Sequence, residues 1–95
     1  MISDDVLIRH RRDVVAAGTG DDMVVLDPDR GEFLELNRTA ARIWALLDEP
    51  TTIAALCQCL VDRFDIAPAA CRDEVTGFVA SLDVRGLIET IEAGH

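Results

Sequence analysis

Apolar residues in the first 36 positions form short runs, separated by charged residues and turn residues. The runs occupy residues 6–8, 14–17, 23–26 and 32–36. Residues 18–22 and 27–31 have the composition of tight turns, because glycine adopts positive φ and aspartate bonds its own backbone. Short strands joined by such turns predict a meander of about three antiparallel strands. The pattern does not decide whether residues 6–8 or residues 14–17 form the first full strand.

The spacing of apolar residues becomes helical after position 36. Asn37 can cap a helix with its side-chain oxygen. The apolar face of this helix is Ala40, Ile43, Trp44 and Leu47. Thr51 or Thr52 can cap a second helix. Its apolar face is Ile53, Leu56, Leu60 and Phe64. Pro68 suits the first turn of a third helix, and Gly86 suits its left-handed C-terminal cap. The apolar stripe of the third helix is Val75, Phe78, Val79 and Leu82.

This order of elements predicts one α+β domain that spans residues 1–95. We expect a winged helix-turn-helix-like arrangement, in which a three-stranded antiparallel sheet is followed by three helices. A sheet this small cannot bury both faces by itself, so the helices must cover one of them. Residues 87–91 are expected to add a short extended segment.

The charge of the chain limits its partners. The 95 residues include 18 acidic and 9 basic residues, which gives a net charge of −9. Such a chain repels phosphate backbones and favours neutral or cationic partners. The third helix, residues 68–85, carries two arginines against three acids, unlike a helix that reads DNA. We therefore expect no nucleic-acid partner and keep a winged-helix DNA-binding regulator only as the alternative.

No set of side chains has the spacing of a catalytic or metal site. Cys57 and Cys59 lie two positions apart in a predicted helix, so their side chains diverge, and no histidine or second cysteine pair completes a tetrahedral set. Cys57 adjoins the apolar face and is predicted to be a core residue. His10 lies in a charged stretch and His95 is the last residue, so we expect neither to be held for proton transfer. The sequence therefore predicts a protein that is not an enzyme and binds no metal or other cofactor.

The cysteines and the hydropathy of the chain indicate a compartment. Three cysteines without the rhythm of a disulfide framework favour a reducing cytoplasm. Residues 1–10 contain no apolar run of signal-peptide length, and no stretch approaches the roughly 20 apolar residues of a membrane span. We expect a cytoplasmic protein with no membrane partner.

The last predicted strand, residues 32–36, is a candidate binding edge. Phe33 and Glu35 lie on one face, and Leu34 and Leu36 lie on the other, because strand side chains alternate. If this strand ends the sheet, its outer N–H and C=O groups have no partner inside the sheet. A segment of another chain could then add as a further strand. The pattern alone favours an ordinary amphipathic edge strand, and it leaves open a homodimer that pairs two such edges.

Several short motifs occur in one order along two-thirds of the chain. They are Val25-Leu26-Asp27, Gly31-Glu32-Phe33-Leu34-Glu35-Leu36-Asn37, Thr39-Ala40, Ile43-Trp44, Leu46-Leu47, Glu74-Val75, Phe78-Val79, Leu82 and Gly86-Leu87-Ile88. In this order they resemble the PqqD-like family, the standalone recognition elements of pathways that modify ribosomally made peptides. The first 20 residues match no part of the family pattern.

The resemblance implies a peptide-binding site. In the family, the leader peptide of a precursor binds antiparallel to the third strand and packs against the third helix. The residues carried over to this sequence are Glu32, Phe33, Leu34, Glu35, Leu36, Glu74, Val75, Phe78, Ser81, Leu82 and Arg85. The family usually has aspartate where Glu74 stands, so the resemblance assigns no specific bond to this carboxylate.

The function implied by the resemblance is recognition without catalysis. Such a protein presents the leader to a separate modifying enzyme, which is a leader peptidase in lasso peptide clusters and a radical SAM enzyme in the pyrroloquinoline-quinone pathway. The block from Gly31 to Leu47 is more similar to the proteins of lasso peptide clusters. The sequence leaves open a monomer or a homodimer, and also a subunit that contributes residues to a partner's active site.

Overall fold

Eight secondary-structure elements follow one another along residues 4–19 and 22–91, the residues that the computed structural model describes. They are β1 (Leu7–His10), β2 (Val15–Thr19), β3 (Asp22–Asp27), β4 (Glu32–Leu36), α1 (Arg38–Leu46), α2 (Ile53–Arg63), α3 (Pro68–Val84) and β5 (Ile88–Ile91). The antiparallel sheet β2-β3-β4 is followed by three helices within the described residues. The predicted α+β class, with a three-stranded sheet before three helices, is therefore confirmed.

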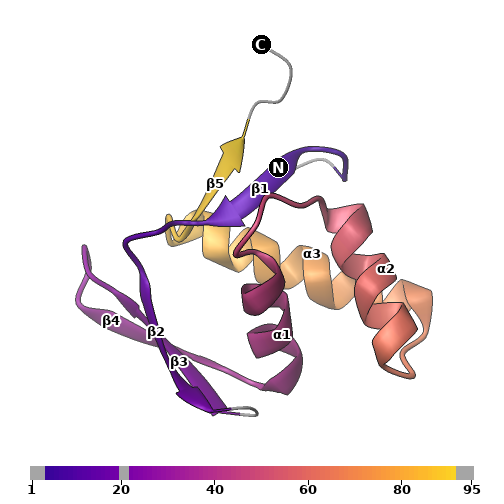
Figure 1. Ribbon diagram of the computed structural model, residues 1–95, viewed down its shortest axis with the longest axis horizontal. Helices are drawn as coiled ribbons and strands as arrows, with labels where there is room; N and C mark the ends of the chain where they lie inside the picture. The colour runs from indigo at the N-terminus through magenta and orange to yellow at the C-terminus, as the bar shows by residue number, and fades with distance from the viewer. Residues whose placement is uncertain (1–3, 20–21, 92–95) are drawn as a thin grey trace.

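Strands β1 and β5 form a second, two-stranded sheet that the local pattern did not predict (Figure 1). Leu7 pairs with Ile91 in an antiparallel register. The Ile8 N–H also donates to the Thr51 carbonyl over 2.7 Å. Both apolar runs near the N-terminus therefore form strands: β2 opens the meander, and β1 joins the end of the chain. The extended segment expected at residues 87–91 is confirmed as β5.

A tight turn places β4 beside β3. The buried Asp27 side chain accepts hydrogen bonds from the backbone N–H groups of Asp29 (3.0 Å) and Arg30 (3.3 Å). Gly31 adopts a φ of +66° and donates its N–H to the Asp27 carbonyl over 2.8 Å. Only glycine enters this left-handed region without strain, so the turn predicted at residues 27–31 is confirmed.

The helix ends follow the predicted local chemistry. The Asn37 side chain accepts from the Ala40 N–H over 2.9 Å at the start of α1. Of the two candidate threonines, Thr52 caps α2 by accepting from the Ala55 N–H over 3.1 Å. Gly86, with a φ of +72°, follows α3 and turns the chain toward β5. These caps fix where α1 and α3 lie relative to β4.

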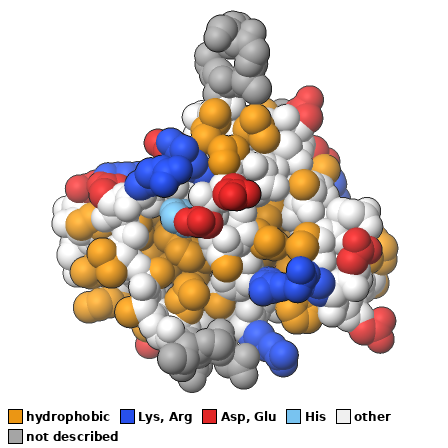
Figure 2. Space-filling model, in the orientation of Figure 1, with side chains coloured by type: hydrophobic (Ala, Val, Ile, Leu, Met, Phe, Trp, Pro, Cys, Tyr) orange, Lys and Arg blue, Asp and Glu red, His pale blue; other side chains and the backbone are white. Residues whose placement is uncertain are grey.

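One face of the β2-β3-β4 sheet is left open to solvent. Val15 is 60% exposed and Phe33 is 69% exposed on this face. Figure 2 shows hydrophobic side chains gathered at the left of the view, where Figure 1 places this sheet. The sheet is therefore covered on one side only, as a single helical layer requires.

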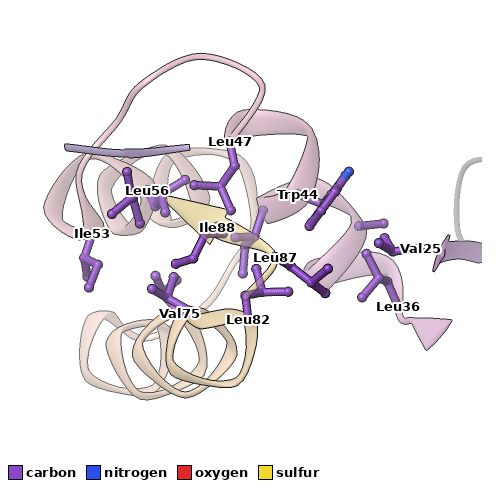
Figure 3. Close-up of a cluster of buried hydrophobic side chains, with 14 of the residues drawn as sticks. Val25, Leu36, Trp44, Leu47, Ile53, Leu56, Val75, Leu82, Leu87 and Ile88 are labelled. Atoms are coloured by element: carbon purple, nitrogen blue, oxygen red, sulfur yellow. The ribbon is translucent and has the colours of Figure 1, made fainter. Parts of the chain in front are cut away.

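The opposite face packs into the core (Figure 3). Val25 of β3 and Leu36 of β4 point toward Trp44 of α1. The core then continues between the helices and β5 through Leu47, Ile53, Leu56, Val75, Leu82, Leu87 and Ile88. One side of α3 is buried in this core, and the C-terminal part of its other side shares a hollow with Glu32 of β4.

Candidate peptide-binding groove

The groove begins with the unpaired edge of β4. This strand pairs with β3 on one side, and no other strand of the described chain pairs with it. Val25 lies opposite Leu34, and Leu26 lies opposite Phe33. In an antiparallel strand, alternate residues direct their N–H and C=O groups to opposite sides, so β4 presents a row of backbone donors and acceptors outward.

The side chains of β4 alternate as predicted. Phe33 and Glu35 are exposed on the open sheet face, where they line a hollow of about 480 Å³ together with Val24. Leu36 is buried and Leu34 is half-buried on the core side. The two faces of the strand therefore have different neighbours, and neither face blocks the backbone edge.

Two hollows lie along α3, one beside the start of β4 and the other just past its end. The larger, about 540 Å³, has Arg30 and Glu32 on the hairpin side. Its wall on α3 and just beyond is formed by Gly77, Ala80, Ser81, Val84 and Arg85. The smaller, about 140 Å³, lies between the start of α1 and the middle of α3. It is lined by Asn37, Thr39, Ala40, Ile43, Glu74 and Phe78.

These positions define the direction of the groove. Glu32 begins β4 and lies across from the end of α3, whereas Asn37 follows β4 and lies across from Glu74 and Phe78. Strand and helix therefore run antiparallel, with a hollow at each end of the same open edge. An extended segment laid along β4 would have backbone partners on one side and the side chains of α3 on the other.

One ion pair joins the two walls. Arg85 Nη1 lies 3.4 Å from Glu32 Oε2, and the two side chains are 35% and 57% exposed. At this exposure an ion pair contributes about 0–1 kcal/mol. A bound segment could displace it at little cost in free energy.

The structure brings part of the predicted site together. Glu32, Ser81 and Arg85 line the larger hollow, and Glu74 and Phe78 line the smaller one. Two predicted contacts occupy a different position, because Val75 and Leu82 are both 0% exposed and pack in the core behind α3. They support the groove from beneath in this structure.

Sequence reasoning assigned Ser81 to the helix wall and missed its neighbours Gly77, Ala80 and Val84. Gly77, Ala80, Ser81 and Val84 recur at i, i+3, i+4 and i+7, the spacing of one helical face. A Cβ built on Gly77 meets nothing within 4 Å. This stripe of small side chains leaves the space of the larger hollow, and its period could have been read from the sequence.

Cys57 and Cys71 belong to the core rather than to a reactive site. The thiol of buried Cys71 donates to the Cys57 carbonyl over 3.7 Å. Burial, and then the neighbouring Cys71, raise the pKa of the Cys57 thiol, which makes the nucleophilic thiolate less available. Within residues 4–19 and 22–91 no group of three or more histidine, cysteine, aspartate or glutamate side chains could hold a metal ion.

The expectation that His10 is not held for proton transfer stays a prediction, but the structure does hold its ring in a defined position. Its ring stacks on Trp44 with the ring centroids 4.6 Å apart and an interplanar angle of 7°. Its Nε2 lies 3.5 Å from Asp48 Oδ1, and its Nδ1 lies 3.0 Å from the Arg11 carbonyl. The charged residues around His10 gave no sign of these contacts, because the stacking partner Trp44 is 34 positions away in the sequence. His95 lies outside the described residues.

No helix of the described chain is both long and apolar enough to cross a membrane.

Comparison with known proteins gives one family and a consistent set of folds. The family model for coenzyme PQQ synthesis protein D (PqqD) matches residues 22–88. No functionally curated protein sequence matches this chain. Among solved structures, lasso peptide synthetase B1 complexed with the leader peptide is 29% identical, with a TM-score of 0.73 over 86% of this chain and 96% of that one.

Two further structures share the fold at lower identity. TbiB1 in complex with the TbiA(beta) leader peptide is 21% identical, with a TM-score of 0.77 over 88% of this chain and 98% of that one. The PqqD truncation of Methylobacterium extorquens PqqCD, described as a functional and stand-alone RiPP recognition element, is 22% identical, with a TM-score of 0.76 over 94% of this chain and 95% of that one.

Proposed function

The chain belongs to the PqqD family, and on that premise we propose that it is a non-catalytic recognition element for the leader segment of a ribosomally made precursor peptide. The leader binds by strand addition to the open edge of β4, and the protein presents it to a separate modifying enzyme. The observation that carries this proposal is the unpaired edge of β4 with hollows at both of its ends, walled by α3. The family match spans both walls of this groove.

The free-energy balance of strand addition indicates which contacts dominate. Ordering each leader residue costs about 1–2 kcal/mol in backbone entropy. Each main-chain hydrogen bond returns about 1 kcal/mol net. Apolar side chains of the leader must supply the surplus, at roughly 25 cal/mol per Å² buried. Phe78 in the smaller hollow and Val84, which is 78% exposed beside the larger one, are the apolar surfaces available to them.

The charges of α3 support peptide binding over DNA binding. Arg72 forms an ion pair with Asp4, and Arg85 pairs with Glu32. Both arginines of this segment therefore already face carboxylates, and phosphate contacts would have to compete with them. No observation favours the DNA-binding alternative.

The likeness to a lasso peptide protein and the charge of the chain indicate which enzyme receives the leader. The 29% identity to lasso peptide synthetase B1 supports a leader peptidase over a radical SAM enzyme. The acidic surface, with a net charge of −9, favours an enzyme with a basic docking face. We place the protein in the cytoplasm, where its three free thiols stay reduced.

A backbone scan of the leader tests strand addition directly. The probe is the fluorescein-labelled synthetic leader of a candidate precursor peptide, chosen from the short reading frames near this gene and titrated by fluorescence anisotropy. Single N-methylation removes one N–H at a time, so strand addition predicts at least tenfold weaker binding at every second position across the stretch that pairs with β4. The positions between them serve as the matched control, with changes within about threefold expected from the same added bulk facing away from the edge.

Amide hydrogen exchange supplies the second readout. Leader binding should slow exchange at alternate residues of β4, while the amides of β1, which lies in the other sheet, stay unchanged. A scan without a two-residue period, together with unchanged exchange in β4, would reject strand addition. Assaying the peptidase on the full precursor with and without the chain then tests presentation.

A further inference from the structure

A further hollow lies on the far side of α1 from the groove. It measures about 520 Å³ and is lined by Arg38 and Arg42 of α1, by Arg63 at the end of α2, and by the apolar side chains of Met23 and Phe64. We call it the arginine pocket. Ala40 and Ile43 line the groove, whereas Ala41, Arg42 and Ala45 line the arginine pocket, so one helix separates the two sites.

The charge of this pocket is opposite to that of the whole protein. Three of the nine basic residues gather here, and among the described residues no acidic side chain lines the hollow. Figure 2 shows arginine side chains in the lower part of the view, with hydrophobic side chains beside them, over the region of α1 and α2. The nearby Asp62 side chain accepts from Gln58 over 3.0 Å and does not line the pocket.

Two of these arginines, Arg42 and Arg63, form no ion pair with an acid in the part of the chain that the structure describes. Five other arginines of the chain form ion pairs with described acids: Arg9, Arg11, Arg30, Arg72 and Arg85. Arg42 and Arg63 form none within the described residues, and the Arg42 Nε is buried there without a hydrogen-bond partner. A buried donor without an acceptor is costly, so a shift of the Arg42 side chain that brings this donor to an acceptor from outside would be favourable.

The shape and chemistry of the pocket define the ligand class. A guanidinium group presents a planar fork of donors that matches a carboxylate with two hydrogen bonds. Met23 and Phe64 add apolar walls that suit a hydrophobic side chain between such carboxylates. A nucleic acid is long enough to feel the net negative charge of the whole protein, which repels it. A short acidic segment bound in the pocket is screened from the distant acids by salt and is attracted by the nearby arginines.

We propose that the arginine pocket binds an acidic peptide segment of a protein partner, with a carboxylate on Arg42 and Arg63 and an apolar side chain against Met23 and Phe64. Because the pocket and the groove lie on opposite faces of α1, a partner can dock here while the groove is occupied. The proposal goes beyond leader recognition and does not depend on it.

The test titrates the protein with acetyl-Glu-Leu-Asp-Glu-Leu-Asp-amide and follows backbone and arginine Nε–Hε signals by NMR. The matched probe is the same peptide with glutamine and asparagine in place of the acids. We expect shifts confined to α1, the end of α2 and the Arg42 Nε–Hε signal, and at least tenfold weaker binding of the amide probe. Equal binding of both probes, or displacement of the acidic probe by equimolar inorganic phosphate, would overturn the proposal.

Variants separate local recognition from general charge. Arg42→Gln/Arg63→Gln should weaken binding of the acidic peptide at least tenfold. Arg9→Gln/Arg12→Gln, which changes the net charge by the same amount elsewhere, should weaken it less than twofold. Equal losses in the two variants would reject a defined site. The single Arg63→Gln variant, at an exposed position, covers the case in which the half-buried Arg42 is needed for folding. Leader affinity is measured in parallel and should not change, so failure here stays distinct from failure of the leader proposal.

Discussion

Replacing Phe78 with alanine is the perturbation that separates peptide recognition from folding. Phe78 is half-buried, packs against the core with one part of its ring, and lines the smaller hollow with the rest. The change therefore removes two contributions, one to stability and one to leader binding. Each can be given a size.

The binding contribution follows from the exposed part of the ring. A phenylalanine side chain offers roughly 200 Å² of surface, and a half-buried ring leaves on the order of 60 Å² for a bound leader side chain. At about 25 cal/mol per Å² this area is worth about 1.5 kcal/mol. Such a loss weakens leader binding roughly tenfold. The lost core contact should lower the free energy of unfolding by about 2 kcal/mol, less than for a fully buried phenylalanine.

Phe64 provides the matched control. It is also half-buried and packed against the core, but it lies after α2 and away from the groove. Phe64→Ala should lose similar stability and keep its leader affinity. Urea unfolding followed by circular dichroism measures the first quantity, and anisotropy of a labelled leader measures the second. If both variants weaken leader binding equally, or if folded Phe78→Ala binds like the original protein, the groove beside α3 is not where the leader binds.

The remaining predictions concern the helix wall, the hairpin and the core thiol. Gly77→Ala should raise the urea midpoint of unfolding, because alanine is favoured in helices by about 1 kcal/mol and its Cβ meets nothing within 4 Å. Gly77→Phe should fill the larger hollow and abolish leader binding while the helical circular dichroism signal stays. Retained leader affinity in Gly77→Phe would contradict the role of that hollow. Asp27→Ala should lower the free energy of unfolding by about 1–2 kcal/mol, since two backbone N–H groups lose their acceptor. Asp27→Asn keeps an oxygen at this position and should retain most of the stability. Equal losses of stability in the two variants would argue against the turn hydrogen bonds. Because the pKa of Cys57 is raised only in the folded state, its contribution to the free energy of unfolding should be constant below the ordinary thiol pKa of about 8.5 and fall as pH rises toward the raised value. Cys57→Ala should flatten that fall in urea titrations between about pH 7 and 10. An unchanged slope in this variant would show that another group titrates.

Features of the fold that depend on nearby residues could be predicted from the sequence. The cap at Asn37, the turn closed by Gly31 and the C-terminal cap at Gly86 each depend on side chains or φ preferences within a few positions. The β1-β5 sheet could not, because Leu7 and Ile91 are joined by a pairing that local periodicity does not encode. The stacking of His10 on Trp44 was missed for the same reason.

The candidate site was predictable to a similar degree. The stripe of Glu74, Phe78, Ser81 and Arg85 follows from the resemblance and helical spacing, and all four line the hollows. Val75 is adjacent in the sequence but faces the core, because a helix turns about 100° per residue. The arginine pocket combines residues of β3, α1 and the end of α2, so only the folded chain brings them together.

The pairing of β1 with β5 has a practical consequence for engineering. The backbone enters the β1-β5 ribbon at Leu7 and leaves it directly opposite, at Ile91, apart from the sheet that carries β4. A unit whose chain ends lie on neighbouring strands can be inserted into a surface loop of a host enzyme through short linkers. Grafting residues 4–91, which keeps the pairing of Asp4 with Arg72, would place a captured substrate tail next to a chosen catalyst.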